Sequence, residues 1–369
     1  MRSRQLRVLH ICGSLTPMPC GIGDYTAHLA EALGEMEAVT AAVLTSRVAS
    51  TVAARSFESM PIVENWRPSA LPGILGAVRR WKPDLVHMQF PSQGYGHSYG
   101  PWLIPGALTL LRYPIVQTWH EYYPAGSGWR NILNALTPGG LIAVRPNYLE
   151  QMPPWYRRIV ARKHFRTIPN AAALPTVSLT EKERLALREK LGVGDRSLVA
   201  YFGFIYPAKG TDAVFDIASP SHDRLVLVGD LKMDDPYHKR IMDRIDSDEW
   251  RGQALTTGFL PEYDAAAILA VADAVVLPFT EGSGPWNTSV YASAKQGTFV
   301  LTTSRTSHGY DAAANVYSAP PGAVDEMRHA LREHVGCRVS RPTDERATEW
   351  RQIAEAHLQV YRQVLGMTA

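Results

Sequence analysis

A glutamate beside a glycine-rich loop is the first place in this sequence where residue types and spacing suggest chemistry. Residues 273–297 read DAVVLPFTEGSGPWNTSVYASAKQG, and the apolar run 274–277 predicts a buried parallel strand. Glu281 and the small-residue loop 282–285 follow it, and a helix is expected over 287–294. Amides and a helix dipole attract anions, and a carboxylate accepts hydrogen bonds from hydroxyls, so this junction suits phosphate or a polyol. The alternative is a solvated loop, because the pattern is common in α/β proteins.

A histidine at the end of another strand is the second candidate. The apolar run 115–119 predicts a strand, and His120 follows it directly. A lone histidine is more often structural than chemical, but the carboxyl ends of parallel strands are where α/β sheets bind ligands. The position of His120 therefore favours a functional role.

Two loops rich in aromatic residues and glycine follow strand ends in the same half of the chain. They cover residues 91–102 and 121–129. Aromatic faces suit the C–H groups of sugar rings, while packing against a neighbouring domain is an equally good explanation. The candidate acceptor-binding residues in these loops are Tyr95, His97, Tyr99, Tyr122 and Trp129.

Strands alternate with helices along the whole chain, which predicts parallel, doubly wound sheets. The pattern pauses at the proline-punctuated segment 167–175 and then restarts. We therefore expect an α/β fold of two facing Rossmann-like domains with a cleft between them. The expected parts are residues 1–174, residues 175–343 and a terminal helical segment 344–369. The first strand and glycine loop lack G-x-G-x-x-G spacing, so a nicotinamide fingerprint is not supported.

Composition excludes several classes of protein. Hydrophobic residues make up 46% of the chain and charged residues 20%, as in a globular protein, and the net charge of +3 does not imply nucleic acid. Three scattered cysteines indicate neither a disulfide framework nor a zinc site, and no other metal-ligand spacing is present. No apolar run reaches membrane-spanning length, so a cytoplasmic protein is expected. On a helix, Arg158, Arg162 and Arg166 would share one stripe; this is either a solvated face or a contact for an anionic membrane or acceptor.

Four segments, in order, resemble those of one family. They are Gly21–Tyr25 before a helix, Tyr201–Gly210, Pro278–Pro285 and the final segment Trp350–Tyr361. Together they resemble the GT-B glycosyltransferases, specifically the retaining family 4 type. In that family the final helix crosses back onto the N-terminal domain.

The resemblance implies transfer of a sugar from a UDP- or GDP-sugar to a glycan, lipid-linked or small-molecule acceptor. It implies retention at the anomeric carbon, no metal and no cofactor, with the leaving diphosphate helping to deprotonate the acceptor. The implied catalytic residues are Glu281 and Lys209, where Lys209 supplies a compact positive charge. His120, proposed from its own position at a strand end, is the third candidate catalytic residue. The implied donor-binding residues are Gly21, Ile22, Gly23, Gly203, Lys209, Glu281, Gly282, Ser283, Gly284, Pro285, Trp286 and Ser289.

The sequence departs from the family pattern at two positions. Phe204 stands where the family usually has an arginine, and Ser289 where it usually has a second glutamate that grips the ribose. A neutral serine is a weaker acceptor than a carboxylate, so weaker nucleotide binding is expected. Two alternatives stay open: a GT-B relative that binds or partners without catalysis, and a nicotinamide-dependent oxidoreductase, against which the missing fingerprint speaks.

Overall fold

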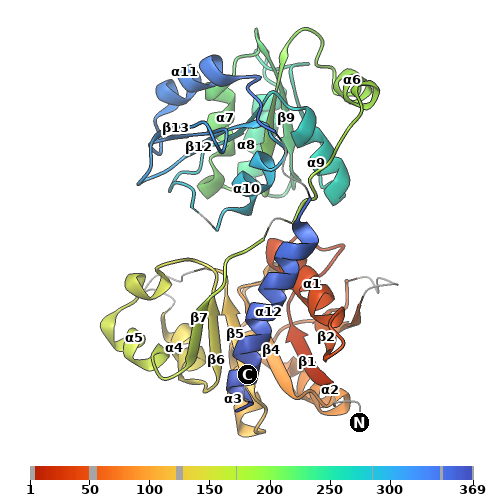
Figure 1. The fold of residues 1–369 in the computed structure, drawn as a ribbon, viewed down its shortest axis with the longest axis vertical. Coiled ribbons are helices and arrows are strands. Elements are labelled where there is room, and N and C mark those ends of the chain that lie inside the picture. Colours follow the sequence, from red (N-terminus) through yellow and green to blue (C-terminus); the bar gives the residue numbers. More distant parts are fainter. Residues whose placement is uncertain are drawn as a thin grey trace. The chain divides into compact units, whose positions relative to one another are not determined.

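The computed structural model describes residues 5–49, 56–121, 128–171, 173–284, 286–340 and 344–367. These residues form two compact units (Figure 1). The N-terminal unit comprises Met1–Ala171 together with Ala347–Ala369, and the second unit comprises Ala172–Arg346. The expected boundaries after 174 and 343 lie a few residues from these.

The N-terminal unit contains a seven-stranded parallel sheet in the order β3-β2-β1-β4-β5-β6-β7. Its strands are β1 (Leu6–Ile11), β2 (Val39–Ser46), β3 (Phe57–Val63), β4 (Leu85–Phe90), β5 (Ile115–Trp119), β6 (Gly140–Ala143) and β7 (His164–Thr167). Its helices are α1 (Gly21–Gly34), α2 (Leu71–Trp81), α3 (Gly100–Leu110), α4 (Gly128–Leu136), α5 (Pro154–Val160) and α12 (Arg346–Val364).

Alternating side chains of the N-terminal sheet enter two separate cores. Leu9 and Ile11 of β1 belong to the core that also contains residues of α2, α3 and α5, whereas Val8 and Cys12 belong to the core that contains residues of α1 and α12. Figure 1 shows α12 lying beside α1 on one face of this sheet. Because both faces are covered by helices, these strands carry apolar residues on both sides.

The second unit contains another seven-stranded sheet, in the order β10-β9-β8-β11-β12-β14-β13, in which β13 alone among the described strands runs antiparallel to its neighbour. Its strands are β8 (Ser197–Phe202), β9 (Asp223–Val228), β10 (Ala254–Thr256), β11 (Ala274–Leu277), β12 (Phe299–Thr303), β13 (Gly309–Asp311) and β14 (Val316–Ala319). Its helices are α6 (Glu181–Lys190), α7 (Thr211–Ile217), α8 (Pro236–Ile245), α9 (Glu262–Val271), α10 (Thr288–Ala294) and α11 (Val324–His334). Helix α7 packs with α8 and α11, and α9 packs with α6 and α10.

The basic segment after residue 156 is not one helix, so the expectation of a shared arginine stripe is wrong. Helix α5 ends at Val160 and β7 begins at His164, which places Arg158 on a helix, Arg162 in a turn and Arg166 on a strand. The Arg166 guanidinium donates to the side-chain oxygen of Gln359 on α12. A short helix followed by an edge strand separates three side chains that a continuous helix would have aligned.

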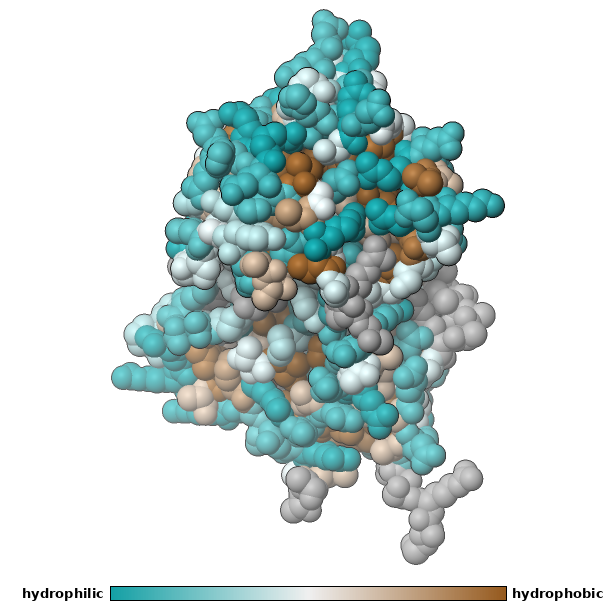
Figure 2. All heavy atoms as spheres, turned by 45° about the horizontal axis from the view of Figure 1, so that its top comes forward, coloured by the Kyte–Doolittle hydropathy of each residue, from teal (hydrophilic) through white to brown (hydrophobic). Residues whose placement is uncertain are grey.

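The surface drawn in Figure 2 is mostly hydrophilic, with hydrophobic residues in small separate groups. Large apolar side chains with more than half of their surface exposed include Leu110, Leu136 and Phe259. Scattered exposed apolar residues of this kind are ordinary for folded proteins. None of the described helices is long and apolar enough to cross a membrane.

Candidate functional site

Two loops interlock at the carboxyl ends of β1 and β4, which are neighbours in the N-terminal sheet. A Cβ on Gly94 would lie 1.8 Å from the carbonyl oxygen of Gly13, and a Cβ on Gly13 would lie 2.7 Å from the ring of Tyr95. The Gly94 amide donates to the Ser14 hydroxyl at 2.8 Å. The two backbones therefore touch where any side chain would clash.

Helix α1 begins within the glycine segment itself, at Gly21. Gly21 is exposed, and Gly23 is buried so that its Cβ would lie 2.7 Å from the carbonyl oxygen of Ser14. Cys20 precedes the helix and makes no side-chain capping bond, and the first amide that bonds back within the helix is that of Asp24. The amides of the first turn, including that of Ile22, are thus oriented for an anion.

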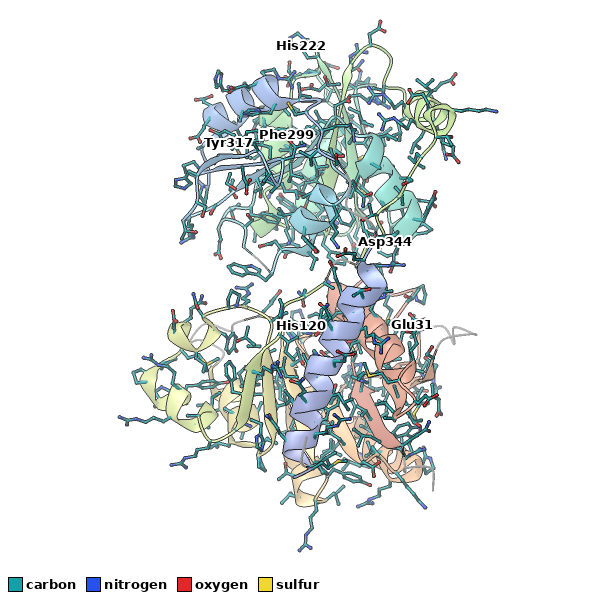
Figure 3. The ribbon with its side chains drawn as sticks, viewed as in Figure 1. Glu31, His120, His222, Phe299, Tyr317 and Asp344 are labelled. Atoms are coloured by element: carbon teal, nitrogen blue, oxygen red, sulfur yellow. The ribbon has the colours of Figure 1, made fainter. Side chains whose placement is uncertain are left out.

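His120 lies at the carboxyl end of β5 and is almost fully buried (Figure 3). Its backbone amide donates to the Phe90 carbonyl at 2.8 Å, and its Nε2 lies 2.9 Å from Oε1 of Gln89. The edge of the Tyr25 ring packs against the imidazole, with the ring centroids 4.7 Å apart. Burial, and to a smaller extent His357, lowers the pKa of His120 to about 3. The imidazole is therefore neutral at physiological pH and can hydrogen-bond a hydroxyl, but it supplies no charge.

The aromatic loop after β4 differs from the expectation in one residue. Tyr95 is buried, with its hydroxyl donating to the Ile11 carbonyl at 3.1 Å and its ring packed against Trp66. The ring fills the space beneath Gly13, so Tyr95 supports the loop and is no exposed platform. His97 and Tyr99 are exposed. Tyr122 and the side chain of Trp129 lie outside the described residues.

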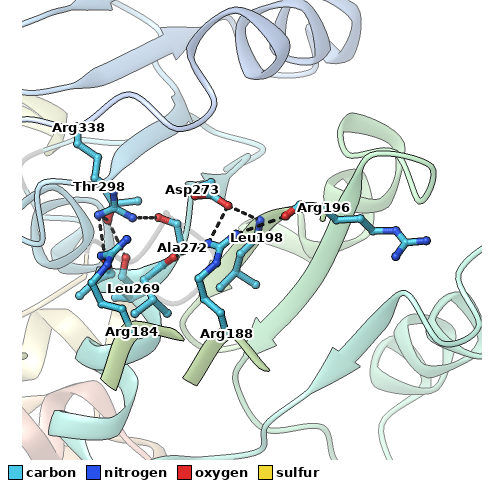
Figure 4. Close-up of polar contacts among 11 residues, drawn as sticks. Arg184, Arg188, Arg196, Leu198, Leu269, Ala272, Asp273, Thr298 and Arg338 are labelled. Carbon is cyan, nitrogen blue, oxygen red and sulfur yellow. Dashed lines mark hydrogen bonds and ion pairs between the residues drawn. The ribbon is translucent and has the colours of Figure 1, made fainter. Parts of the chain in front are cut away.

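In the second unit, an arginine cluster organises one end of the strands that carry the other candidates. Arg184 and Arg338 donate to the carbonyl of Ala270 at the end of α9, at 3.3 and 2.8 Å (Figure 4). Arg188 donates to Oδ2 of Asp273, which also accepts from the amide at the start of β8, and these distances are 2.9 and 2.7 Å. These cations satisfy carbonyls that the helix leaves without partners. Asp273, which precedes β11, links the amino ends of β8 and β11 through its bond to the Leu198 amide.

The opposite ends of β8 and β11 bring Lys209 and Glu281 onto two joined loops. The loop after β8 ends in a short helix of residues 207–209, and the Ala208 carbonyl accepts from the Thr280 amide at 3.2 Å. The Lys209 ammonium lies over the Phe279 ring, 4.7 Å from its centroid. Glu281 is exposed, and Gly210 must be glycine because a Cβ there would lie 2.1 Å from the Pro278 carbonyl. A cation and a carboxylate thus share one edge of the sheet.

The amides after Glu281 are already engaged, so the expectation of free amides is wrong for three of them. The amide of Gly282 donates to the Phe279 carbonyl at 3.2 Å, that of Ser283 to the Thr303 carbonyl at 2.6 Å, and that of Gly284 to Oδ1 of Asn287 at 2.9 Å. The loop therefore closes on itself and on β12. Its amides shape the position of Glu281 and do not point at a ligand in this conformation.

The other candidates in this loop have mixed surroundings. Trp286 is half-buried, and its ring covers Gly284 so closely that a Cβ there would lie 2.3 Å away. Pro285 lies outside the described residues. Ser289 is in the first turn of α10, where its carbonyl accepts from Ser293. Gly203 has a positive φ of 134° at the end of β8, a conformation that favours glycine.

Residues 20–202 match the family model described as the glycosyl transferase 4-like domain. The chain is a GT-B protein, and its first half is similar to glycosyltransferase 4-like domains. No curated protein sequence matches it significantly.

Solved structures resemble this glycosyltransferase over its whole length. Sucrose-phosphate synthase from Thermosynechococcus elongatus has a TM-score of 0.70 at 15% identity and covers 98% of this chain and 100% of its own. A glycosyltransferase from Rickettsia africae has a TM-score of 0.70 at 14% identity, with 99% and 100% covered. HepE from Anabaena has a TM-score of 0.66 at 14% identity, with 98% and 99% covered. At these identities the likeness concerns the fold of two Rossmann-like domains.

A histidine that the sequence did not single out holds the Lys209 loop of the glycosyltransferase. His238 of α8 is buried, and its Nδ1 accepts from the Lys232 amide at 2.7 Å while its Nε2 donates to the Ile205 carbonyl at 2.6 Å. Both backbone partners dictate the same neutral tautomer, with the proton on Nε2. Its position on an amphipathic helix resembles that of any core residue, so no sequence signal distinguishes it.

Proposed function

We propose that this glycosyltransferase transfers a sugar from a UDP- or GDP-sugar to a glycan, lipid-linked or small-molecule acceptor. The observation that carries the proposal is the pairing of Lys209 and Glu281 on joined loops at the ends of β8 and β11. HepE, which has a similar fold, was solved in complex with UDP-glucose. A diphosphate needs a cation and a sugar needs hydrogen-bond acceptors, and this edge supplies both.

The proposed chemistry is transfer with retention at the anomeric carbon. Lys209 stabilises the negative charge that develops on the departing diphosphate, and Glu281 accepts hydrogen bonds from the hydroxyls of the donor sugar. The diphosphate oxygen takes the proton of the attacking acceptor hydroxyl as the glycosidic bond forms. His120, which is neutral, hydrogen-bonds a hydroxyl close to the reacting carbon.

We also propose that the N-terminal unit binds the acceptor. Exposed His97 and Tyr99 follow β4, and His120 follows the neighbouring strand β5. These strand ends lie at one edge of the sheet, where α/β proteins bind ligands. Trp129 and Tyr122 keep the acceptor-binding role that the sequence predicts.

The decisive test is hydrolysis and transfer across a panel of nucleotide sugars, with and without EDTA. One UDP- or GDP-sugar should be consumed with retention, as read by NMR of the anomeric proton. EDTA should not reduce the rate, because the described residues include no group of three histidine, cysteine or carboxylate side chains that could hold a metal ion. Rescue of an EDTA-treated enzyme by manganese would contradict metal independence. A thermal shift with UDP or GDP and no turnover would favour a binding or partner subunit.

Replacing Lys209 with alanine should raise the dissociation constant for UDP or GDP about tenfold or more, because one charge-assisted hydrogen bond contributes about 1.5–3 kcal/mol. Titration calorimetry measures the change. Exposed Lys190 on α6 provides the control, and Lys190→Ala should bind like the wild type. Equal affinities of all three proteins would place the diphosphate elsewhere.

One stretch of the N-terminal unit has an excess of basic residues. Residues 100–171 contain eight lysines and arginines and two acidic residues, a net +6, whereas the whole chain is +3. Helix α4 packs with α3 and α5, and exposed Leu110, Leu136 and Trp155 lie in or next to these helices. Basic residues beside exposed apolar ones suit an anionic membrane surface. We therefore propose peripheral membrane contact through this face.

Vesicle sedimentation tests that contact with two matched arginine pairs. Arg157→Glu/Arg158→Glu in the last turn of α5 should weaken binding to vesicles containing phosphatidylglycerol at least about tenfold, because each basic residue near an anionic surface contributes about 1 kcal/mol. Arg79→Glu/Arg80→Glu in the last turn of α2 makes the same charge change elsewhere and should have little effect. Equal losses in both variants, or no binding by the wild type, would contradict the proposal.

A further inference from the structure

An arginine at the end of β12 lies against the backbone of the Glu281 loop. Arg305 follows β12 by two residues, and its Nε donates to the Glu281 carbonyl at 2.8 Å. A Cβ on Gly282 would lie 3.4 Å from Cγ of Arg305 and 3.1 Å from its backbone nitrogen. The stem of this side chain is therefore packed along the loop.

The turn that carries Arg305 is held by its own hydrogen bonds. The Ser304 hydroxyl accepts from the amides of Thr306 and Ser307 at 3.2 and 3.1 Å. Nε2 of His308 lies 3.0 Å from the Ser304 carbonyl. The backbone position from which the guanidinium extends is thus defined before any ligand arrives.

The outer edge of the guanidinium is uncommitted within the described part of the chain. Its hydrogen bond to Glu281 uses Nε, and no carboxylate of the described residues lies within 4.0 Å to form an ion pair with it. Arg305 is exposed. The two terminal nitrogens of an arginine form a planar fork that matches two oxygens of a phosphate.

Lys209 and Arg305 approach the same short segment from opposite sides. Strands β8, β11 and β12 are consecutive in the sheet, so β8 and β12 lie two strand spacings apart, roughly 10 Å. Lys209 lies over Phe279 and Arg305 bonds to Glu281, and both of these residues follow the central strand. An anion placed above residues 279–281 is within reach of both side chains.

We propose that Arg305 is a second diphosphate-binding residue, which grips the donor from the side opposite Lys209. This inference rests on the proposed function. A diphosphate carries several negative charges and grows more negative as the sugar leaves, so two flanking cations stabilise it better than one. Phe204, in the loop after β8, supplies no charge. Arg305 supplies a positive charge from the turn after β12.

Titration calorimetry with UDP, GDP and the matching monophosphates tests the inference. The proteins compared are wild type, Arg305→Ala, Arg305→Lys and the control Arg251→Ala. Arg251 is an exposed arginine paired with Asp248. Arg305→Ala should weaken binding of the diphosphate about tenfold or more and that of the monophosphate much less, so that the affinity ratio of the two nucleotides narrows. The diphosphate affinity of Arg305→Lys should fall between those of the wild type and Arg305→Ala, because lysine keeps the positive charge but lacks the planar fork of two nitrogens. Arg251→Ala should match the wild type.

Three outcomes distinguish a failure of the Arg305 inference from a failure of the proposed function. If the wild type binds neither UDP nor GDP, the proposed function fails and the inference with it. If the wild type binds and Arg305→Ala binds equally well, the inference alone is overturned. If diphosphate affinity is unchanged and donor hydrolysis falls, Arg305 merely holds the Glu281 loop, which also overturns diphosphate binding.

Discussion

Glu281→Ala should abolish transfer while the protein stays folded. Glu281 is exposed, so its removal leaves no cavity in the core, and its carboxylate is placed by a loop whose own amides bond to Phe279, Thr303 and Asn287. Losing one charge-assisted hydrogen bond costs about 1.5–3 kcal/mol, and more when the bond strengthens in the transition state. A loss of about 100-fold or more in kcat is therefore expected.

Steady-state donor consumption measures the loss of transfer, and thermal melting measures whether the protein stays folded. Glu281→Gln should retain more activity than Glu281→Ala, because an amide keeps one acceptor oxygen without the charge. Exposed Glu189 on α6 provides the control, and Glu189→Ala should transfer sugar like the wild type. Turnover close to wild type in Glu281→Ala would remove Glu281 from the site.

Acid should destabilise the N-terminal unit well above the pH at which carboxylates titrate. Four buried histidines lie between the N-terminal sheet and the helices α1 and α12, and each contacts another of them or Tyr25; they are His10, His87, His120 and His357, the last of which belongs to α12. Burial is the largest cause of their lowered pKa values, which are about 3 for His10 and His120, about 4 for His357 and well below the ordinary value for His87.

The sign of the effect follows from where protons bind. Below pH 6.5 the unfolded chain protonates these histidines, whereas the folded unit keeps them neutral down to about pH 4. The unfolded state therefore gains protons as the pH falls, and the free energy of unfolding drops by about 1.4 kcal/mol per pH unit for each histidine. The neighbouring hydroxyls of Tyr25 and Tyr361, whose pKa values burial raises, stay neutral throughout this range.

Denaturant unfolding at pH 5, 6 and 7, followed by tryptophan fluorescence, measures the slope of the free energy of unfolding against pH. His10→Leu should reduce it by about 1.4 kcal/mol per pH unit without loss of stability at pH 7, because neither ring nitrogen of His10 has a partner among the described residues. Exposed His164 on β7 is the control, and His164→Leu should leave the slope unchanged. Identical slopes for the wild type and His10→Leu would show that His10 titrates normally in the folded protein.

The contacts of these histidines could not be predicted from the sequence. His10 on β1, His87 on β4 and His120 after β5 all point to the face covered by α12, where Nδ1 of His87 lies 2.7 Å from the hydroxyl of Tyr361. The apolar face of the final helix, which includes the buried Trp350, follows from the periodicity of its apolar residues. The partners of that face were not, because strands buried on both sides carry no alternation that says which side meets which helix.

The sequence by itself determined the order of strands and helices and the residues that stand at strand ends. Glu281 after β11 and His120 after β5 were placed by local signals, namely an apolar run followed by glycine, proline or a polar residue. Such signals act within a few residues, as at Thr180, whose capping box with Glu183 begins α6.

Tertiary structure decided which strand ends lie close together and which polar groups at those ends are available to a ligand. Tyr95 is buried because Gly13, which has no side chain, leaves room for its ring. The amides of Gly282 and Ser283 donate to the carbonyls of Phe279 and Thr303. Arg305 came beside Glu281 because β12 pairs with β11 in a register that no local pattern encodes. Contacts between residues far apart in the chain depend on strand order and loop closure, and those are properties of the packed sheet as a whole.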